Sequence, residues 1–278
     1  MKIGFIGLGN MATAIIGGLL REDTTLSSED GNVTVITAAN IIGSAKTEAT
    51  RQKRAEQFGI AITASNREVA EAADVLVLAV KPQFFPEVIA EIRDAVSENT
   101  LVISIAAGLT LERIAGLFDR NVTAMRLIRC MPNTPALVNA GCTAVVPGPG
   151  ATEADEALCL RLMESFGRAI IIPERLMDAA SATAGSSPAF VFMFVEALAD
   201  GAVAAGMPRA QAYEFAAAAV AGSAQLVLET GRHPGDLKDM VCSPGGTTIE
   251  GVRALEEGAF RASVMNAISA CVEKAKAL

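Results

Sequence analysis

The stretch KIGFIGLGNMATAIIGGLL, residues 2–20, decides how the beginning of this chain folds. A short apolar run leads into Gly7, Gly9 and Ala12, and a helical pattern follows. Such glycines let the backbone turn tightly and approach a pyrophosphate, and the free N–H groups of the helix start attract its charge. Because the motif follows a strand and opens a helix, it predicts dinucleotide binding rather than a simple tight turn.

Short apolar runs alternate with helical patterns over the first half of the chain. We expect strands, buried on both faces, at 2–6, 33–37, 60–63, 74–80, 100–105 and 122–128. Helical patterns lie between them near 10–20, 44–58, 67–72, 84–95 and 110–118, and further elements follow near 142–146, 152–165 and 168–172. This alternation predicts an α/β fold of Rossmann type over residues 1–173, with a doubly wound parallel sheet.

Residues 174–278 form a second region, which is helical throughout. Breaks are expected near 185–188, 206–208, 231–234 and 243–246. The segments at 189–206 and 210–228 are apolar on most faces, and such helices need burial on all sides. We therefore expect an all-α dimerisation domain in which subunits pack against each other, with a single well-buried helix in a monomer as the alternative.

Composition excludes several classes of function. The 278 residues carry a formal net charge of −8, which argues against nucleic acid as a partner. Without a leader pattern or an uncharged apolar run of membrane-spanning length, we expect neither export nor a membrane. The cysteines form no CxxC pair, which favours reduced thiols in the cytoplasm and no metal site; they are Cys130, Cys142, Cys159, Cys242 and Cys271.

Histidine, tyrosine and mid-chain lysine, which often serve as acids or bases in dehydrogenases, are scarce. The chain has one histidine, one tyrosine and no lysine between Lys81 and Lys238. His233 lies among Gly231, Pro234 and Gly235, where a structural role is favoured over catalysis. Lys81 follows a predicted strand at the edge where open α/β sheets bind ligands, so it can reach cofactor phosphate or ribose; a plain loop lysine is the alternative.

The predicted second strand bears on the choice between NADPH and NADH. An NAD site usually has Asp or Glu at the end of that strand. Here the strand at 33–37 leads to Asn40 with no acid, and Lys46, Arg51, Lys53 and Arg54 follow. A solvated helix face explains most of these charges. The missing carboxylate still favours NADPH, with NADH as an alternative.

Six motifs occur in order across nearly the whole chain: GFIGLGNMA (4–12), LAVKPQ (78–83), SIAAGL (104–109), RCMPNTPA (129–136), GSSPAF (185–190) and SPGGTTIEGV (243–252). Together they closely resemble the pyrroline-5-carboxylate reductase family. The resemblance implies an oxidoreductase that reduces the cyclic imine 1-pyrroline-5-carboxylate to L-proline with NAD(P)H, the last step of proline biosynthesis. It also implies a homo-oligomer, a dimer or larger, up to a decamer of five dimers.

The resemblance also implies site residues. The cofactor contacts would be Ile6, Gly7, Leu8, Gly9, Asn10, Met11, Asn40, Asn66, Ala79, Val80, Lys81, Pro82, Ile105, Ala106 and Ala107. Within this set, Asn66 would face the adenosine phosphate side. The substrate contacts would be Ser243, Gly245, Gly246, Thr247 and Thr248. Members often carry Ser or Asn-Arg just after the second strand, where this chain has AANIIGSAK.

The SPGGTT segment suits this chemistry. An iminium accepts hydride readily, so position and electrostatics matter more than a strong acid. Thr247 and Glu250 match a capping box, and free N–H groups at that helix start would bind a carboxylate. We expect Thr248 to be the catalytic residue, as hydrogen-bond partner of the ring nitrogen.

Three rival functions remain in view. The β-hydroxyacid dehydrogenases need a lysine early in the second domain, and ketol-acid reductoisomerases need clustered carboxylates there; this chain lacks the lysine and differs from the second group in its hydride-site motifs. A non-enzymatic NADP sensor on the same fold is the third, and the intact SPGGTT segment argues against it.

Overall fold

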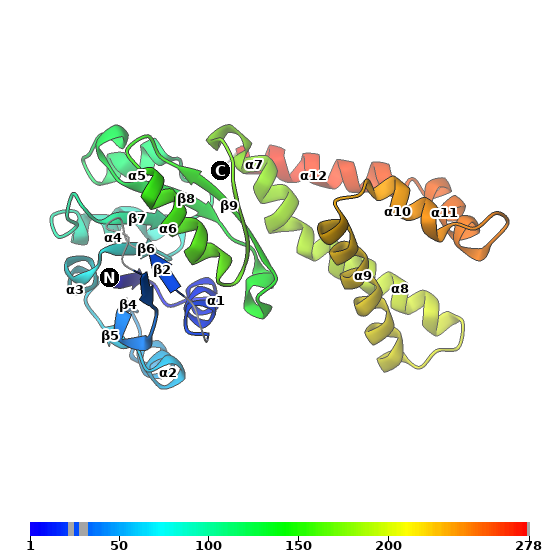
Figure 1. The fold of residues 1–278 in the computed structure, drawn as a ribbon, viewed down its shortest axis with the longest axis horizontal. Coiled ribbons are helices and arrows are strands. Elements are labelled where there is room, and N and C mark those ends of the chain that lie inside the picture. The colour runs from blue at the N-terminus through cyan, green and yellow to red at the C-terminus, as the bar shows by residue number, and fades with distance from the viewer. Residues whose placement is uncertain (22–24, 28–32, 277–278) are drawn as a thin grey trace. The chain divides into compact units, whose positions relative to one another are not determined.

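A computed structural model describes residues 1–21, 25–27 and 33–276 of the chain. Two compact units are present. The first consists of Met1–Gly185 together with the described residues from Lys274 onward, and the second consists of Ser186–Glu273 (Figure 1). The boundary expected after Pro173 therefore lies inside the first unit. The division into a dinucleotide-binding domain, 1–173, and a dimerisation and substrate domain, 174–278, remains a proposal.

An eight-stranded sheet forms the centre of the first unit, in the order β10-β9-β8-β7-β6-β1-β4-β5. All neighbours are parallel except β8 and β9. The chain builds β4 and β5 on one side of β1 and then crosses to β6 on the other, which makes the carboxyl ends of β1 and β6 a switch point for ligand binding. The strands are β1 (Ile3–Ile6), β4 (Ile41–Ser44), β5 (Ala61–Thr63), β6 (Val75–Leu78), β7 (Leu101–Ser104), β8 (Leu127–Met131), β9 (Gly141–Pro147) and β10 (Gly167–Ile171).

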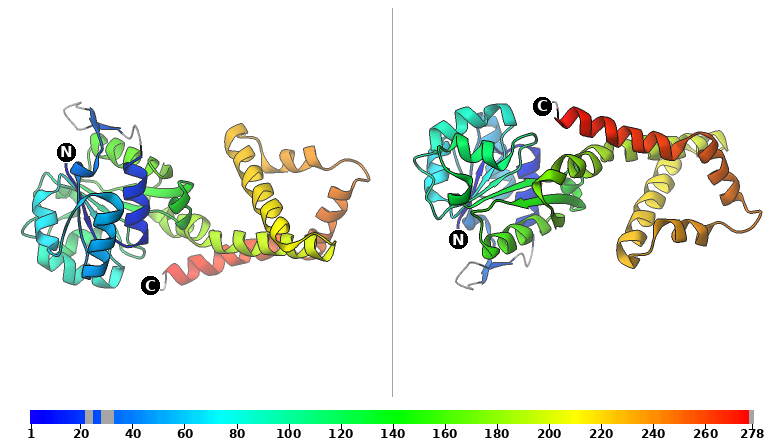
Figure 2. Two further views of the ribbon diagram at one scale, coloured as in Figure 1. Left: turned by 90° about the horizontal axis from the view of Figure 1, so that it is seen from below. Right: turned by 90° about the horizontal axis from the view of Figure 1, so that it is seen from above.

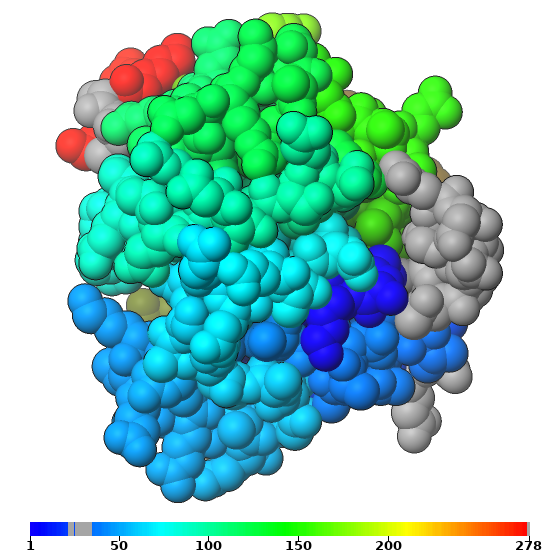
Figure 3. Space-filling model, turned by 90° about the vertical axis from the view of Figure 1, so that its left-hand side faces the viewer, coloured from blue at the N-terminus to red at the C-terminus, as the bar shows by residue number. Residues whose placement is uncertain are grey.

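Helices cover both faces of this sheet, as the predicted three-layer fold requires. One apolar core joins the sheet to α1 (Asn10–Leu19), α2 (Glu48–Phe58) and α6 (Glu153–Glu164). The other joins it to α3 (Asn66–Ala72), α4 (Phe85–Ile92) and α5 (Leu111–Leu117). On the side of the molecule shown in Figure 3, the colour runs from blue through cyan to green, so the chain from about residue 50 to about residue 120 covers much of this surface.

The predicted second strand was wrong in its place and its partners. β3 (Val33–Val35) pairs with β2 (Thr25–Ser27) in a separate antiparallel ribbon, and the strand beside β1 is β4. Gly43 makes β4 hard to recognise, and the Leu8 side chain packs directly on it, since a Cβ there would lie 2.8 Å from Leu8 Cδ2. The prediction at 122–128 was also early, since 122–124 is a 3₁₀ turn and β8 begins at Leu127.

The break expected at 185–188 is a continuous helical passage instead. It runs from α7 (Met177–Ala180) through a π-helical turn, Ser181–Ser186, into α8 (Ser187–Ala204). Pro188 has no N–H for the carbonyl of Ala184, four residues back. That carbonyl accepts a hydrogen bond from Asn133 Nδ2 at 2.9 Å, and Asn133 Oδ1 accepts one from Cys142 N at 2.8 Å. Asn133 of the MPNTP motif thus joins the π-helical turn to β9.

The second unit buries very little of its own apolar surface. It contains α8, α9 (Arg209–Thr230), α10 (Pro234–Val241), α11 (Thr247–Glu257) and, up to Glu273, α12 (Phe260–Lys276). α8 and α9 pack through Ala199, Ala212 and Ala216, and Figure 2 shows the two helices crossing. The rings of Phe194 and Phe260 lie 5.8 Å apart and join α8 to the start of α12.

Large apolar side chains of α8, α9 and α12 remain exposed in the single chain: Phe192, Met193, Phe215 and Met265 are each 66–69% exposed. Within the described residues, the helical stretch Glu174–Ala204 is long and apolar enough to cross a membrane by length and composition, a test that core helices also pass. Surfaces of this kind are typical of helices that a second subunit covers.

A buried carboxylate fastens α6 to the start of β8. Asp155 is fully buried, and its carboxylate accepts from Arg126 Nε at 3.0 Å and Nη2 at 2.5 Å and from Thr152 N at 2.9 Å. Burial raises the pKa of this carboxyl, but the bonds from Arg126 and Thr152 outweigh burial and hold the pKa below its usual value. The charged form therefore stabilises the fold.

We predict that Asp155→Asn lowers the free energy of unfolding at pH 7 by about 3 kcal/mol, because it removes the charged partner of Arg126. A lowered folded-state pKa gives stabilisation that is complete above the unfolded pKa of about 3.9 and is lost as pH falls through the folded value. The difference between variant and wild type should therefore shrink in acid. Urea titrations from pH 7 to pH 3 measure it.

Asp119→Asn is the control for that experiment. Asp119 pairs with Arg93, and the side chains are 70% and 44% exposed, so the change should stay below about 0.5 kcal/mol. A loss from Asp155→Asn that is equally large at pH 3 and pH 7 would contradict the role given to its charge.

Candidate cofactor and substrate sites

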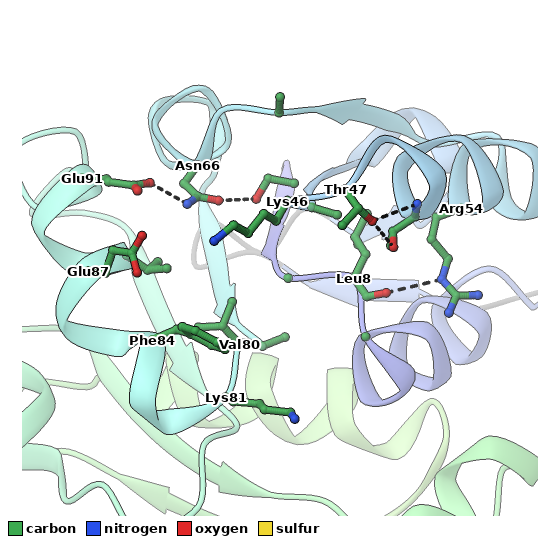
Figure 4. A pocket seen from close by; sticks show the side chains of 18 of the residues that line it. Leu8, Lys46, Thr47, Arg54, Asn66, Val80, Lys81, Phe84, Glu87 and Glu91 are labelled. Atoms are coloured by element: carbon green, nitrogen blue, oxygen red, sulfur yellow. Dashed lines mark hydrogen bonds between the residues drawn. The ribbon is translucent and has the colours of Figure 1, made fainter.

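A cavity of about 660 Å³ opens at the carboxyl ends of β1, β4, β5 and β6 (Figure 4). This is the edge and the switch point at which open α/β sheets bind nucleotides. Segments far apart in sequence meet here: Gly7–Asn10, Ser44–Thr47, Thr50, Arg54, Ala64, Asn66, Ala79–Lys81, Phe84, Glu87, Val88 and Glu91.

The glycine turn forms one wall of the cavity. Gly7 has φ +93°, and a Cβ there would lie 2.8 Å from Val80 Cγ1, so both its conformation and its surroundings exclude a side chain. A Cβ on Gly9 would meet no atom within 4 Å, because that position faces open space. Gly9 caps α1 without a side-chain hydrogen bond, which leaves the N–H groups of the first turn to a ligand. The turn therefore fits a pyrophosphate.

The end of β4 supplies positive charge. Ser44 is followed by Ala45, Lys46 and Thr47, and Lys46 extends into the cavity in Figure 4. Arg54 on α2 also lines the cavity, and its Nε donates to Leu8 O of the glycine turn at 3.4 Å. The strand that lies beside β1 thus ends in a serine, a lysine stands two residues further on, and no acidic residue stands at its end.

A hydrogen-bond chain crosses the opposite wall. Ser44 Oγ donates to Asn66 Oδ1 at 2.7 Å, and Asn66 Nδ2 donates to Glu91 Oε2 at 2.6 Å. Glu87 lies one turn before Glu91 on α4 and lines the same cavity. Phe84 and Val80 form an apolar surface below these carboxylates in Figure 4.

The structure brings together about half of the predicted cofactor residues: Gly7, Leu8, Gly9, Asn10, Asn66, Ala79, Val80 and Lys81. Ile6, Met11, Pro82 and Ile105–Ala107 are not among the lining residues, and their assignment stays a prediction. Ile105–Ala107 follow β7 at the same edge of the sheet, beside β6.

Asn40 has to be removed from the predicted set. It lies in a 3₁₀ turn, Ala38–Asn40, at the amino end of β4, which is the other edge of the sheet. Its Nδ2 donates to Met1 O at 3.1 Å and its Oδ1 accepts from Thr37 N at 3.0 Å. The error followed from placing the second strand too early.

Sequence reasoning missed several lining residues. Lys46 and Arg54 were noticed in the sequence as charges after the predicted second strand. They line the cavity because they follow the end of β4, the strand that pairs with β1. Thr47, Thr50, Phe84, Glu87 and Glu91 had none, because only the fold brings α2 and α4 to this cavity.

The SPGGTT segment is a turn that opens α11. Gly245 has φ +68°, and Gly246 N donates to Ser243 O at 3.0 Å. The positive φ of Gly245 favours glycine at that position, and a Cβ on Gly246 would lie 2.3 Å from Ser243 Oγ and would require that hydroxyl to move. Ser243, Thr247 and Thr248 are exposed in the single chain, and Thr248 is the second residue of α11.

The predicted capping box was wrong. Gly246 is the cap residue of α11 and makes no side-chain cap, while Thr247 is already helical. Glu250 pairs with Arg253 at 3.0 Å instead of reaching back. Without a side-chain cap, the N–H groups of the first turn remain open to an anion. His233 has the structural role that was favoured: it caps α10, and its Nδ1 accepts from Gly235 N at 3.0 Å.

Comparison with known proteins first defines a class of enzyme. A family described as "NADP oxidoreductase coenzyme F420-dependent" matches residues 2–108, and one described as "Pyrroline-5-carboxylate reductase dimerisation" matches residues 174–278. The chain is thus an oxidoreductase with a Rossmann domain and a helical region through which it associates with itself.

Relatives then identify the family. Pyrroline-5-carboxylate reductase of Escherichia coli is 50% identical over 277 residues, which cover 100% of this chain and 98% of the relative. The solved structure of such a reductase from Coxiella burnetii has a TM-score of 0.89 at 33% identity and covers 99% of this chain and 97% of its own. The Plasmodium falciparum enzyme, solved with NADP bound, has a TM-score of 0.81 at 29% identity and covers 100% of this chain and 97% of its own.

The chain belongs to the pyrroline-5-carboxylate reductase family. The predicted activity, reduction of 1-pyrroline-5-carboxylate to L-proline with NAD(P)H, is thereby confirmed.

The two glycines of the turn should respond differently to alanine. Gly9→Ala should cost at most about 1 kcal/mol of stability, the price of a poorer helix cap, yet raise the KM for cofactor at least about tenfold by filling the pyrophosphate position. Gly7→Ala should destabilise the fold by roughly 3 kcal/mol, because strain and overpacking combine. Thermal unfolding and steady-state kinetics separate the effects. Unchanged cofactor affinity in Gly9→Ala would show that the cofactor does not lie on this turn.

Proposed function

We propose that this reductase holds NADPH in the cavity at the sheet edge, in preference to NADH. The pyrophosphate would lie on Gly7–Asn10, and the 2′-phosphate would lie at the end of β4. The observation that carries this proposal is the set of groups there: Lys46, Thr47, Thr50 and Arg54 line the cavity, and β4 ends in serine with no acid. A phosphate dianion gains from such cations and hydroxyls, whereas the ribose 2′-hydroxyl of NADH needs the missing carboxylate.

Lys46→Ala tests the preference. Following absorbance at 340 nm with 1-pyrroline-5-carboxylate, we expect wild type to favour NADPH. The variant should raise the KM for NADPH about tenfold and change the KM for NADH less than about threefold, because only NADPH has the phosphate that loses a charged partner.

Lys53→Ala is the matched control, since Lys53 is on the same helix as Arg54 but does not line the cavity. Equal effects of Lys46→Ala on both cofactors would overturn the 2′-phosphate site while leaving the activity intact.

We further propose that the SPGGTT turn binds the substrate. Its carboxylate would be held by the first-turn N–H groups of α11, with Ser243, Gly245, Gly246 and Thr247 as its surroundings. The reduced nicotinamide supplies hydride to the carbon of the C=N bond. The chain's own task is to orient the ring and to stabilise a protonated nitrogen, which suits a protein with one histidine, one tyrosine and no lysine between Lys81 and Lys238.

Thr248 is the proposed hydrogen-bond partner of the ring nitrogen. Thr248→Ala should lower kcat/KM about tenfold or more, as expected for a lost transition-state hydrogen bond, whereas Thr248→Ser keeps the hydroxyl and should retain most activity. A kcat/KM for Thr248→Ala within about twofold of wild type would remove Thr248 from the mechanism.

The cellular setting and assembly complete the proposal. We expect a cytoplasmic enzyme with no nucleic-acid or membrane partner. Beyond self-association through residues 174–278, we propose a dimer as the basic unit, up to a decamer of five dimers. The exposed apolar side chains of α8, α9 and α12 support the dimer. The mass in solution, measured by light scattering, distinguishes the two assemblies.

A further inference from the structure

Two carboxylates in the cofactor cavity call for an explanation. Glu87 and Glu91 both line a space proposed for a ligand with a pyrophosphate and, in NADPH, a further phosphate. Like charges disfavour binding, so each carboxylate weakens the attraction that Lys46 and Arg54 provide. We therefore ask whether either carboxylate helps cofactor binding in another way. The hydrogen bond between Glu91 and Asn66 indicates that Glu91 does.

Glu91 determines which way the Asn66 amide faces. An ionised carboxylate only accepts hydrogen bonds, so the Asn66 group beside it, at 2.6 Å, is the NH₂. The amide oxygen then faces Ser44, whose hydroxyl donates to it at 2.7 Å. Ser44 is 1% exposed, so its hydroxyl is held inside the wall. The chain from Ser44 through Asn66 to Glu91 thus has a single direction (Figure 4).

Without Glu91 this direction is lost. A hydroxyl can donate or accept, so Ser44 tolerates either end of the Asn66 amide. Asn66 would then present an N–H or a carbonyl oxygen to the cavity with little preference. Phosphate oxygens on the adenosine side of the cofactor only accept hydrogen bonds, and a carbonyl turned toward them would repel them.

We propose that Glu91 is a positioning residue for the cofactor: it orients the Asn66 amide so that the remaining N–H of Asn66 donates to the adenosine phosphate side. This inference rests on the proposed placement of the cofactor in the cavity. Glu91 acts through Asn66 and does not itself touch the cofactor. Among the described residues, Glu87 has no hydrogen bond to Asn66 and contributes only its charge.

The proposal and simple electrostatics predict opposite signs for Glu91→Ala. Removing a negative charge from a cavity for a polyanion should tighten binding if charge is all that matters. Loss of amide orientation should weaken it. Glu87→Ala removes the same charge from the same helix and cavity, so it measures the electrostatic effect alone.

The experiment titrates NADPH into the purified full-length chain and follows nicotinamide fluorescence. We expect Glu91→Ala to raise the Kd about fivefold or more, and Glu87→Ala to leave it unchanged or lower it. Glu91→Gln also loses the fixed direction, because its amide can offer either a donor or an acceptor to Asn66, so it should raise the Kd as well, by a smaller factor than Glu91→Ala. In steady-state assays the loss in Glu91→Ala should appear in the KM for NADPH rather than in kcat. Thermal unfolding of each variant confirms that it folds.

A double-mutant cycle with Asn66→Ala tests whether Glu91 acts through Asn66. The effect of Glu91→Ala should disappear in the Asn66→Ala background, because no amide is left to orient. Tighter binding by Glu91→Ala, or an equal loss with and without Asn66, would overturn the proposal. If neither Asn66→Ala nor Lys46→Ala changes NADPH affinity, the placement of the cofactor is wrong and the inference falls with it.

Discussion

Close backbone approach around β1 is the constraint on which the first unit depends. A Cβ on Gly4 would lie 2.8 Å from Ala73 Cβ and from Val69 Cγ1, and a Cβ on Gly43 would lie 2.8 Å from Leu8 Cδ2. The bare backbone of Gly4 lets α3 pack onto β1, and the Leu8 side chain of the turn after β1 packs directly on Gly43 of β4. The bare backbone of Gly7 likewise allows a close approach to the end of β6. These approaches bring the ends of three strands together, and the cavity results.

The cavity has an uneven charge distribution, and this has a functional consequence. Lys46 and Arg54 stand with the glycine turn on one side, while Glu87 and Glu91 stand on α4. The hydride leaves from the nicotinamide, remote from the adenosine half. Contacts with the adenosine half therefore act by fixing the position of the reactive end, which is how remote binding energy contributes to catalysis. In the proposed placement of the cofactor, a correctly oriented Asn66 would contribute to holding the adenosine half.

Elements with strong local signals were predictable. The apolar run at 74–80 became β6, and the Gly7-x-Gly9 turn opened α1 as expected. Predictions failed where a sequence pattern is weak or fits more than one structure. Val33–Val35 is a strand by pattern, but the pattern does not say that it pairs with β2 instead of β1. At SPGGTT the Thr-x-x-Glu spacing was present, yet the helix starts one residue earlier than a Thr247 cap requires.

By itself, the sequence determined the fold class, the glycine turn, the self-associating helical region and the family, because these depend on local periodicity and on motifs contiguous in the chain. Only the tertiary structure decided that Lys46, Asn66, Glu87 and Glu91 share one cavity and that Asn40 lies at the opposite sheet edge. The reason is physical: strand order and helix packing set which distant residues meet, and the direction of the Ser44–Asn66–Glu91 chain depends on donors and acceptors that come into contact only on folding.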